Sequence, residues 1–347
     1  MLRIGLVGCG HIGTVHAYAL QQLAEASLID ARLTATFDTD ASRAERVARH
    51  HGGAPAATLE GLLDAVDVVW VCTWTAAHLD VVQAAADRGL PVFCEKPLAR
   101  DLPECEAVAA GLSRVPHQVG LVLRWSPVFL RAHELLASGR YGRVLAAVLR
   151  DDQYFPIQGL YGSTWRRERR LAGGGTLLEH SIHDVDVLRW LLGDPAEVTA
   201  RVASRFGHDG IDDVVSATFS FADGAVASLT SVWHQVLARE SSRRLEVFCE
   251  DALLWTDDDH LGPLHVETSA GTEVLEGELP TWSPLLSVPE VFAKAVAHYA
   301  APSKAFLDGL PEGVGGRPGA PDALAAHRLV DAAYRSAAAG GAPTRAC

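Results

Sequence analysis

The stretch Gly8-Cys9-Gly10-His11-Ile12-Gly13 decides the fold of the first part of the chain. It follows an apolar run, residues 3–7, and precedes residues 14–25, whose apolar positions have helical spacing. A G-x-G-x-x-G turn between a strand and a helix is typical of a dinucleotide-binding loop, because the helix N-terminus presents free N–H groups to phosphates. The first glycine permits the tight turn, the second lets the backbone approach a pyrophosphate, and the third allows close packing of helix on strand. The alternative is a tight glycine turn that binds no ligand.

The first third of the chain alternates short apolar runs with helical patterns. The expected strands are 3–7, 32–37, 66–72, 91–95 and 118–123, and the expected helices are 14–25, 40–51, 78–88 and 103–112. Strands that are apolar almost throughout indicate a parallel sheet covered on both faces. We therefore predict an α/β fold whose N-terminal domain, residues 1–124, is a doubly wound parallel sheet of the Rossmann type.

After about residue 124 the pattern changes to that of an α+β domain. We expect helices at 128–138 and 176–192 and strands at 143–151, 197–206, 214–221, 226–233, 244–249 and 264–267. Ala222-Asp223-Gly224 suits a hairpin turn between two of these strands. We therefore predict a mostly antiparallel, open sheet over residues 125–320; its roles in substrate binding and oligomerisation are implied by the family resemblance described below. One face of strand 214–221 carries small polar side chains, which either pack on another subunit or meet water.

The C-terminal part begins with residues 310–321, which are rich in glycine and proline and are expected to form a loop. The segment 321–347 is expected to contain a helix, residues 323–338, that packs back on the body of the protein.

Composition excludes several classes of function. The chain has 347 residues, enough for two domains, and a balance of 48% hydrophobic and 21% charged residues that is ordinary for a globular protein. A net charge of −13 argues against a nucleic-acid partner. The basic stretch 166–170 is expected to be a solvated surface or a local anion contact.

Location is predicted from the same features. The chain opens directly into an apolar strand and has no run long enough to cross a bilayer, so we expect neither a signal peptide nor a membrane segment. The six cysteines, at positions 9, 72, 94, 105, 249 and 347, show no metal-ligand or disulfide spacing. Reduced, buried thiols in a cytoplasmic protein are the simplest interpretation.

Asp38 directly follows the second expected strand. A carboxylate there accepts hydrogen bonds from adenosine ribose hydroxyls and repels a 2′-phosphate. The sequence therefore predicts NAD as cofactor, with NADP less favoured, although Arg43 lies only one helical turn away. The alternative role of Asp38 is to cap the next helix.

Glu95-Lys96-Pro97 follows an apolar strand at its carboxyl end, where open α/β sheets place ligands. A lysine at this position can hydrogen-bond a substrate hydroxyl, and burial would weaken its hold on its own proton. Taken alone, the tripeptide is equally compatible with a surface lysine.

A second dense polar patch follows the triple glycine at 173–175. On one helix Glu179, His183 and Asp186 share a face, because they are spaced by four and three residues. A histidine beside a carboxylate is a suitable proton acceptor near neutral pH. The alternatives are a histidine satisfied within the helix, an ordinary ion pair, or a metal site made of His180, His183 and Asp186; we expect no metal, since His180 points elsewhere on such a helix.

Together these blocks resemble the glucose-fructose oxidoreductase and inositol dehydrogenase family (Gfo/Idh/MocA) over nearly the whole chain. The resemblance rests on the glycine turn followed by His16, on Cys94-Glu95-Lys96-Pro97-Leu98-Ala99, on residues 120–127 and 139–144, and on the triple glycine that leads to Glu179 and His183. It implies that residues 73–78 form a nicotinamide loop at a strand end. The cofactor contacts it implies are the turn residues 8 and 10–13 with Asp38, Thr73, Trp74, His78, Glu95 and Lys96.

The resemblance also implies a reaction. Lys96 and His183 would flank the reacting hydroxyl, with His183 as general base and Lys96 steering and polarising the oxygen. The carbinol hydrogen would pass as hydride to the nicotinamide. Ile182-His183-Asp184 followed by Asp186 is most similar to inositol dehydrogenases. A sugar or cyclitol substrate and a homodimer or homotetramer, joined through the open face of the second sheet, are the expectations that follow.

Two departures from the family bear on the substrate. Glu179 replaces the usual aspartate in the catalytic set, and Trp74 stands where the strand-end loop usually has a proline or asparagine. The substrate-facing side chains are expected to include Lys96, Glu179 and His183 together with Arg124, Tyr154, Trp165 and Arg166. Aromatic rings suit the apolar faces of sugars and arginine suits a hydroxyl pair or a carboxylate, although Trp165 could equally be a core residue.

Three classes of function are therefore compared. The first is a dehydrogenase or reductase acting on a secondary alcohol or ketone of a sugar-like molecule. The second is a glycosidase that uses tightly held NAD for a transient oxidation. The third is an NAD-binding regulator without chemistry, and the presence of both Lys96 and His183 counts against it.

Overall fold

The computed structural model describes residues 1–256 and 258–346, so Cys347 lies outside the described residues. The chain divides into two compact units. The first unit consists of residues 1–99, 103–125 and 279–324, and the second consists of residues 100–102, 126–278 and 325–347. No helix of the described residues is long and apolar enough to cross a membrane.

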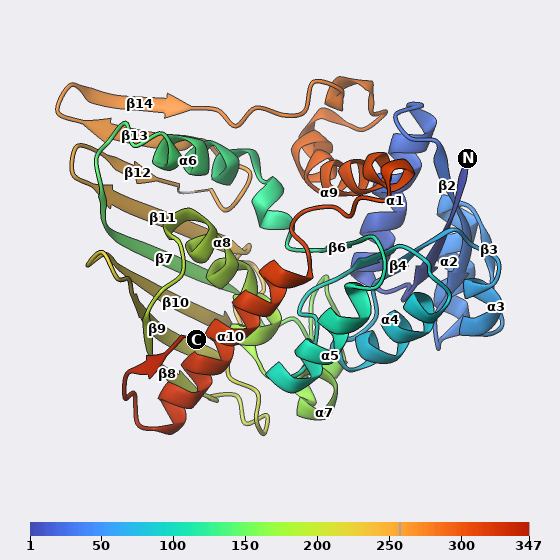
Figure 1. Cartoon of the computed structure of the whole chain (residues 1–347), viewed down its shortest axis with the longest axis horizontal. Helices are drawn as coiled ribbons and strands as arrows, with labels where there is room; N and C mark the ends of the chain where they lie inside the picture. The colour runs from blue at the N-terminus through green and yellow to red at the C-terminus, as the bar shows by residue number, and fades with distance from the viewer. Residues whose placement is uncertain (257, 347) are drawn as a thin grey trace. The chain divides into compact units, whose positions relative to one another are not determined.

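The first unit is built on a parallel sheet with the strand order β3-β2-β1-β4-β5-β6 (Figure 1). Its strands are β1 (Leu2–Val7), β2 (Ala31–Phe37), β3 (Ala54–Pro55), β4 (Val68–Val71), β5 (Val92–Cys94) and β6 (His117–Val119). Its first helices are α1 (His11–Glu25), α2 (Ala41–His51), α3 (Leu59–Leu63), α4 (His78–Asp87) and α5 (Leu102–Leu112), with the 3₁₀ turns η1 (Thr75–Ala77) and η2 (Val122–Trp125). The predicted doubly wound parallel sheet is confirmed.

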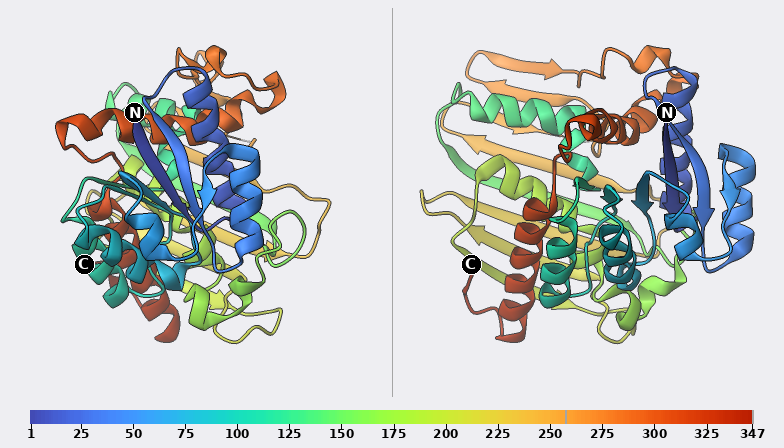
Figure 2. Two further views of the ribbon diagram at one scale, coloured as in Figure 1. Left: turned by 90° about the vertical axis from the view of Figure 1, so that its right-hand side faces the viewer. Right: turned by 45° about the vertical axis from the view of Figure 1, so that its right-hand side comes forward.

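Alternation of side chains along the strands explains why helices cover both faces of this sheet. On β1, Ile4 and Leu6 belong to a core shared with α1 and α2. Val7 belongs to a separate core shared with α3, α4 and α5. Successive residues of a strand point to opposite faces, so a strand that is apolar throughout must be covered twice (Figure 2).

The first unit also contains a helix that the sequence patterns did not predict, α9 (Glu290–Gly309), which is followed by the short turn η6 (Leu310–Glu312). We expected residues 279–320 to belong to the second domain, but they group with the first unit. The reason is packing: Ala300 of α9 shares a small core with Ala19 and Leu23 of α1. Pro302 lies inside α9, and an internal proline is a signal against a helix when only sequence is read.

The second unit is built on a nine-stranded sheet with the order β14-β13-β12-β11-β7-β10-β9-β8-β15 (Figure 1). Its strands are β7 (Val144–Tyr154), β8 (Glu197–Ala203), β9 (Val214–Ser220), β10 (Val226–His234), β11 (Ser242–Cys249), β12 (Leu253–Trp255), β13 (Leu264–Thr268), β14 (Gly271–Leu275) and β15 (Thr344–Arg345). Only β10 and β7 pair in parallel, so the predicted mostly antiparallel sheet is confirmed. Gly224, with φ of +93°, turns the chain between β9 and β10 as expected.

One face of this sheet is buried and the other is open. On β10, Ala227, Leu229 and Trp233 are buried, while Val226 is 42% exposed. The helices on the buried side are α6 (Pro127–Ala137), α8 (Ile182–Leu192) and the part of α10 (Ala320–Ala338) beyond residue 324 (Figure 1). Among the described residues of this unit, no helix covers the opposite face.

The helix expected over residues 176–192 is interrupted. The structure has a π-helical turn, η4 (Thr176–His180), followed after Ser181 by α8. The Ser181 N–H donates to the carbonyl of Thr176, five residues earlier, which is the π-helical pattern. Residues 175–177 are also tied to a distant loop, because Asp212 accepts hydrogen bonds from the backbone N–H groups of Gly175 and Leu177. Such tertiary contacts override the local pattern.

Candidate active site

The glycine turn of the first unit has the backbone geometry of a phosphate cradle. A Cβ on Gly8, where φ is +94°, would lie 2.5 Å from the backbone of Cys72, and a Cβ on Gly13 would lie 2.1 Å from the carbonyl oxygen of Gly8. Neither position accepts a side chain. A Cβ on Gly10, in contrast, would meet no described atom within 4 Å.

The start of α1 is likewise suited to an anion. Gly10 is the N-cap of this helix and offers no side-chain cap, and His11 and Ile12 form its first positions. The first N–H groups of a helix lack partners within the helix and carry a partial positive charge. Open space beside Gly10 and an uncapped helix end together fit the pyrophosphate of a dinucleotide.

Asp38 joins the end of β2 to the glycine turn. Its Oδ2 accepts a hydrogen bond of 2.8 Å from the N–H of Cys9, and its Oδ1 accepts one of 2.9 Å from the N–H of Asp40. The alternative role as a helix cap is wrong, because Asp40 is the N-cap of α2 and accepts from Ser42. Asp38 is therefore fixed by backbone donors beside the cradle, and its contact with a ribose stays a prediction.

The segment 73–78 forms a short loop and the turn η1 after β4. Trp74 is half-buried. The buried His78 contacts the carbonyl of Leu98 through Nδ1 and that of Thr73 through Nε2, both at 3.3 Å. His78 thus braces this loop against the segment that follows Lys96.

Glu95 and Lys96 stand just beyond the carboxyl end of β5. Glu95 is buried, and its Oε1 lies 2.7 Å from Nε2 of the fully buried His16. Its Oε2 accepts a hydrogen bond from the N–H of Lys96 at 3.2 Å, and Lys96 is half-buried. The backbone of Lys96 is thereby held by a buried His–Glu pair. His16 was absent from our expected site residues, although its position one helical turn beyond Gly13 could have suggested it.

Arg124 also belongs to the first unit, at the end of η2. Its Nη1 lies 3.1 Å from Oδ1 of Asp322, and its side chain is 12% exposed. This ion pair ties the segment after β6 to the start of α10. A role for Arg124 toward substrate stays a prediction.

In the second unit, Glu179 lies in the π-helical turn and is 2% exposed. Its Oε2 accepts a hydrogen bond of 3.1 Å from Nε of Arg166. The guanidinium of Arg166 also lies over the ring of Trp165, 4.4 Å from its centre. The basic stretch is thus a set of local ion pairs, since Arg170 pairs with Glu168 in the same way.

His183 and Asp186 lie on α8, and both are buried. The expected shared face assumed one continuous α-helix, which the π turn at Glu179 replaces, so the four-residue spacing no longer defines the geometry between Glu179 and His183. His180 instead contacts Asp151 at 2.7 Å. In the described part of the chain, no group of three His, Cys, Asp or Glu side chains is arranged to hold a metal ion.

Two aromatic candidates have structural contacts. The hydroxyl of Tyr154, at the end of β7, accepts a hydrogen bond from the N–H of Leu160. Trp165 is partly buried against a core that contains Phe155 and Trp233, so the core alternative describes part of its environment.

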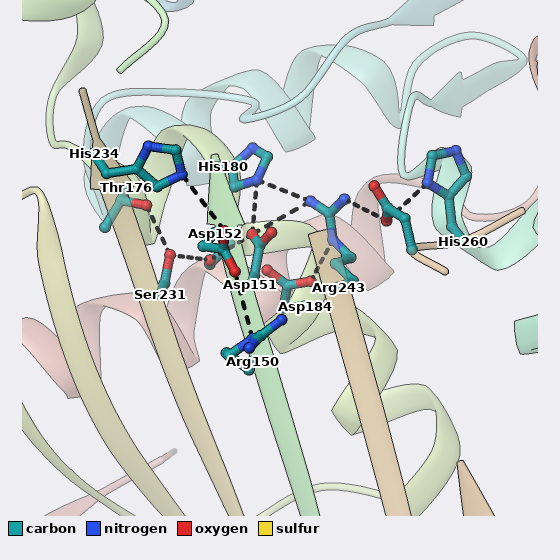
Figure 3. Close-up of polar contacts among 12 residues, drawn as sticks. Arg150, Asp151, Asp152, Thr176, His180, Asp184, Ser231, His234, Arg243 and His260 are labelled. Atoms are coloured by element: carbon teal, nitrogen blue, oxygen red, sulfur yellow. Dashed lines mark hydrogen bonds and ion pairs between the residues drawn. The ribbon is translucent and has the colours of Figure 1, made fainter. Parts of the chain in front are cut away.

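The sequence patterns missed a cluster around the buried Arg243 of β11 (Figure 3). Arg243 alternates with Leu245 and Val247, and all three are buried. An arginine in the apolar register of a strand was the available signal, because buried charges require partners. The loop beside this cluster lines an open cavity of about 600 Å³ formed by residues 236, 238–242, 258 and 259.

The five cysteines within the described range are buried and form no disulfide, as expected. Burial raises the pKa of the Cys9 thiol to about 12, with a further increase from the charge of Asp38. A thiol with such a pKa stays protonated and unreactive.

Comparison with known proteins identifies two matching regions. A model described as "Oxidoreductase family, NAD-binding Rossmann fold" matches residues 2–121, and one described as "GFO/IDH/MocA C-terminal domain" matches residues 129–254. An inositol 2-dehydrogenase of Rhizobium meliloti is 29% identical over 97% of both chains. A 1,5-anhydro-D-fructose reductase of Ensifer adhaerens is 35% identical over 55% of this chain and 59% of its own length.

A solved structure supports the fold over the full length. The oxidoreductase domain protein from Kribbella flavida superposes with a TM-score of 0.89, at 24% identity, over 100% of this chain and 99% of its own.

Proposed function

The chain belongs to the Gfo/Idh/MocA family of NAD-binding oxidoreductases, and from this premise we propose that it interconverts a secondary alcohol and a ketone on a sugar or cyclitol. The observation that carries the proposal is the open, uncapped glycine turn at Gly10, which fits a dinucleotide. Bound NAD supplies the acceptor for the hydride that leaves the carbinol carbon. The residues of the chain must bind the alcohol and take its proton.

We propose that His183 accepts the proton of the alcohol. A buried histidine can accept a proton near neutral pH, and general-base catalysis of this kind contributes about 10²- to 10⁴-fold in rate. Lys96 is assigned the role of donating a hydrogen bond to the substrate oxygen. The backbone of Lys96 is anchored by Glu95, which supports a fixed starting point for its side chain.

Glu179 is assigned to substrate binding and positioning. Its contact with Arg166 makes it a charged acceptor of hydrogen bonds, which suits a hydroxyl of a polyol better than it suits proton abstraction. Tyr154, Trp165 and Arg166 remain proposed substrate contacts from the same unit.

The substrate class is inferred from the relatives. The Rhizobium relative is named for inositol and the Ensifer relative for an anhydro sugar, so we propose a cyclic polyol or its ketone. NAD is proposed over NADP, because Asp38 presents a carboxylate beside the cradle.

The test is a screen of the purified chain with inositols, hexoses, sugar acids and aminosugars, with NAD and NADP in parallel. The expected result is a change in nicotinamide absorbance with at least one cyclic polyol, and a larger rate with NAD. Cleavage of a glycoside without net reduction of the cofactor would favour the glycosidase alternative. Clear NAD binding without turnover of any compound would favour the regulator.

We also propose that a second copy of this chain covers the open face of the sheet in the second unit. Val226 and Phe248 flank Ala146 across three neighbouring strands and are 42% and 38% exposed, and Val148 on the same face is 39% exposed. Apolar side chains gathered in one register are typical of a homo-oligomer interface. Light scattering of the chain and of a Val148→Glu variant tests this: a wild-type dimer or tetramer that the variant dissociates supports it, and a wild-type monomer contradicts it.

A further inference from the structure

The buried cluster of the second unit gathers charged side chains from five segments (Figure 3). Arg243 of β11 is 5% exposed and donates from Nε to Asp184 of α8 at 2.8 Å. It donates from Nη1 to Asp259 at 3.1 Å and from Nη2 to Asp151 of β7 at 3.4 Å. His180 of η4 completes the group, since its Nε2 lies 2.7 Å from Oδ2 of Asp151. Asp151 and Asp184 are both 0% exposed.

The charges of this cluster do not balance when every carboxyl is ionised. Three carboxylates surround one guanidinium, and burial of an uncompensated charge is costly. Among the described residues, no N–H or O–H group reaches Oδ1 of Asp151 or Oδ2 of Asp184. Both carboxyls contact the same guanidinium, Asp184 at Nε and Asp151 at Nη2. A proton held by this pair would reduce the excess negative charge around Arg243 by one.

The contacts of His180 lead to the same proton. Its Nε2 lies 2.7 Å from Asp151 Oδ2 and 3.1 Å from Nη2 of Arg243. An arginine only donates, so Nε2 must be unprotonated to accept from Arg243, whereas it must carry a proton to donate to an ionised Asp151. One nitrogen cannot do both at once. The two contacts therefore describe two protonation states of the same cluster.

These two states carry the same net charge. In one state the proton is on the Asp151–Asp184 pair and His180 is neutral. In the other both carboxyls are ionised and His180 is positive. Transfer of the proton between them moves charge within the cluster without changing its total, so it avoids the cost of adding a charge to a buried site.

The remaining groups that face the cluster fit this description. Nδ1 of His260 lies 3.0 Å from Asp259. Although burial opposes it, the positive charge of Arg243 and the hydrogen bond with His260 hold the pKa of Asp259 well below its usual range. Ser181 donates to Asp151 at 3.3 Å, and Tyr161 is close enough for its pKa to respond to Arg243. Burial first, and the charge of Asp151 second, raises the pKa of Asp184 to about 7. Asp184 is thus the member of the cluster that titrates near neutral pH.

We propose that Asp151, Asp184 and His180 hold one exchangeable proton, and that this group takes up, through His180, the proton that the proposed base His183 removes from the alcohol, and later releases it. This rests on the proposed function. Oxidation of an alcohol breaks an O–H and a C–H bond, sends the hydride to the nicotinamide and leaves one proton to be removed. The proton is balanced by its uptake into the cluster in the state that lacks the exchangeable proton, with both carboxyls ionised and His180 neutral. His180, with 14% of its side chain exposed, is the member of the set that water reaches. Asp151 and Asp184 act as positioning residues, because they work through His180.

The decisive experiment does not depend on turnover. Infrared difference spectra of the full chain, recorded from about pH 5 to about pH 9, report the carbonyl stretch of protonated carboxyl groups. We expect a band that disappears on passing through neutral pH and that is absent in Asp184→Asn. Asp152→Asn is the matched control. Although burial opposes the shift, the hydrogen bond and charge of Arg239 lower the pKa of Asp152, so this carboxyl is ionised over the whole pH range and adds no protonated-carboxyl band.

The outcomes are distinct. Burial also raises the pKa of Asp212, so the difference between wild type and Asp184→Asn isolates the cluster. A titrating band that persists unchanged in Asp184→Asn overturns the proposal, as does the absence of such a band in the wild type. If Asp184→Asn does not fold, His180→Gln serves instead, and the midpoint of the band must then shift by about one pH unit or more.

The catalytic part is tested on the pH profile of kcat with the substrate found by the screen. His180→Gln and Asp184→Asn should each move or remove the ionisation near neutral pH, while KM for NAD changes less than about twofold. If both variants show the same pH profile of kcat as the wild type, the cluster has no role in the reaction. A chain that shows the infrared band but no dehydrogenase activity would contradict the proposed function and leave the shared proton established.

Discussion

The glycine turn of the first unit is formed by backbone atoms, whereas the Arg243 cluster of the second unit is formed by side chains. The turn consists of six consecutive residues and functions through backbone N–H groups and the absence of side chains. The cluster consists of side chains that are 92 and 59 residues apart, as for Arg243 with Asp151 and with Asp184. A backbone site is damaged by adding atoms, whereas a side-chain site is damaged by changing charge. The predictions below test this difference.

The largest effect is expected at the two side chains that we propose to take part in the reaction. Lys96→Ala and His183→Ala should each lower kcat by about 10²- to 10⁴-fold, because a hydrogen-bond donor or a general base is lost. Steady-state kinetics measures this, and the Kd for NAD should stay within about twofold of wild type. His265→Ala is the matched control, since His265 stacks on Trp255 of the second sheet. Normal turnover in both variants would remove these residues from the mechanism.

The second effect concerns charge in the cluster. The pKa of Asp184 is raised in the folded chain from an ordinary 3.8 to about 7, so the folded state keeps this proton where the unfolded state has lost it. The resulting stability is fully present below about pH 4 and is lost as the pH rises to about 7, at roughly 1.4 kcal/mol for each pH unit. Asp184→Asn removes this contribution. The variant should therefore be most destabilised relative to wild type at about pH 4.5 and least destabilised at about pH 8.

Urea unfolding of wild type and Asp184→Asn across this range measures the difference. Asp152→Asn should show no such trend between about pH 5 and about pH 8, because Asp152 is ionised throughout. A constant difference between wild type and Asp184→Asn would show that Asp184 is ionised in the folded chain as well.

The same contrast explains what the sequence could predict. The parallel sheet, the glycine turn and the position of Lys96 at a strand end follow from local patterns, because each depends on neighbouring residues. The π turn at Glu179 and the Arg243 cluster depend on partners far along the chain, such as Asp212 and Asp151. Periodicity cannot reveal those partners. It could have revealed only that Arg243 occupies an inward position.

Two further differences have the same cause. The sequence gives α9 no distinct start, since its N-cap is Pro289 without a side-chain cap, and Pro302 interrupts its pattern. Its packing on α1 decides where it belongs. Asp38 follows the second strand as expected. Its contact with the N–H of Cys9 joins residues 29 positions apart and appears only in three dimensions.

The third effect tests the backbone site. Gly10→Ala adds a methyl group that, apart from its chain neighbours, meets no described atom within 4 Å, so folding should be unchanged. The methyl group would occupy the space proposed for the pyrophosphate, and the Kd for NAD should rise by about tenfold or more. Gly13→Ala is the contrasting variant, because its Cβ would lie 2.1 Å from the Gly8 carbonyl. It should lower stability by about 1–3 kcal/mol. Binding calorimetry measures the first effect and thermal unfolding measures the second. Unchanged NAD affinity in Gly10→Ala would mean that the pyrophosphate does not bind beside Gly10.

The smallest effect tests a side chain that serves the backbone site. Asp38→Ala removes a carboxylate proposed to bind the ribose, and it removes the acceptor of the Cys9 N–H. NAD affinity should fall by about three- to tenfold, while NADP affinity changes little or rises. The ratio of the affinity for NAD to that for NADP should therefore decrease. Asp40→Ala is the matched control, because Asp40 is exposed and caps α2 without contacting the turn. Equal losses for both cofactors in Asp38→Ala would show that Asp38 only shapes the turn. In that case any preference for NAD would have to arise from residues other than Asp38 and Arg43, since an arginine at the start of α2 favours a 2′-phosphate. The carboxylate would then belong with the scaffold of the cradle.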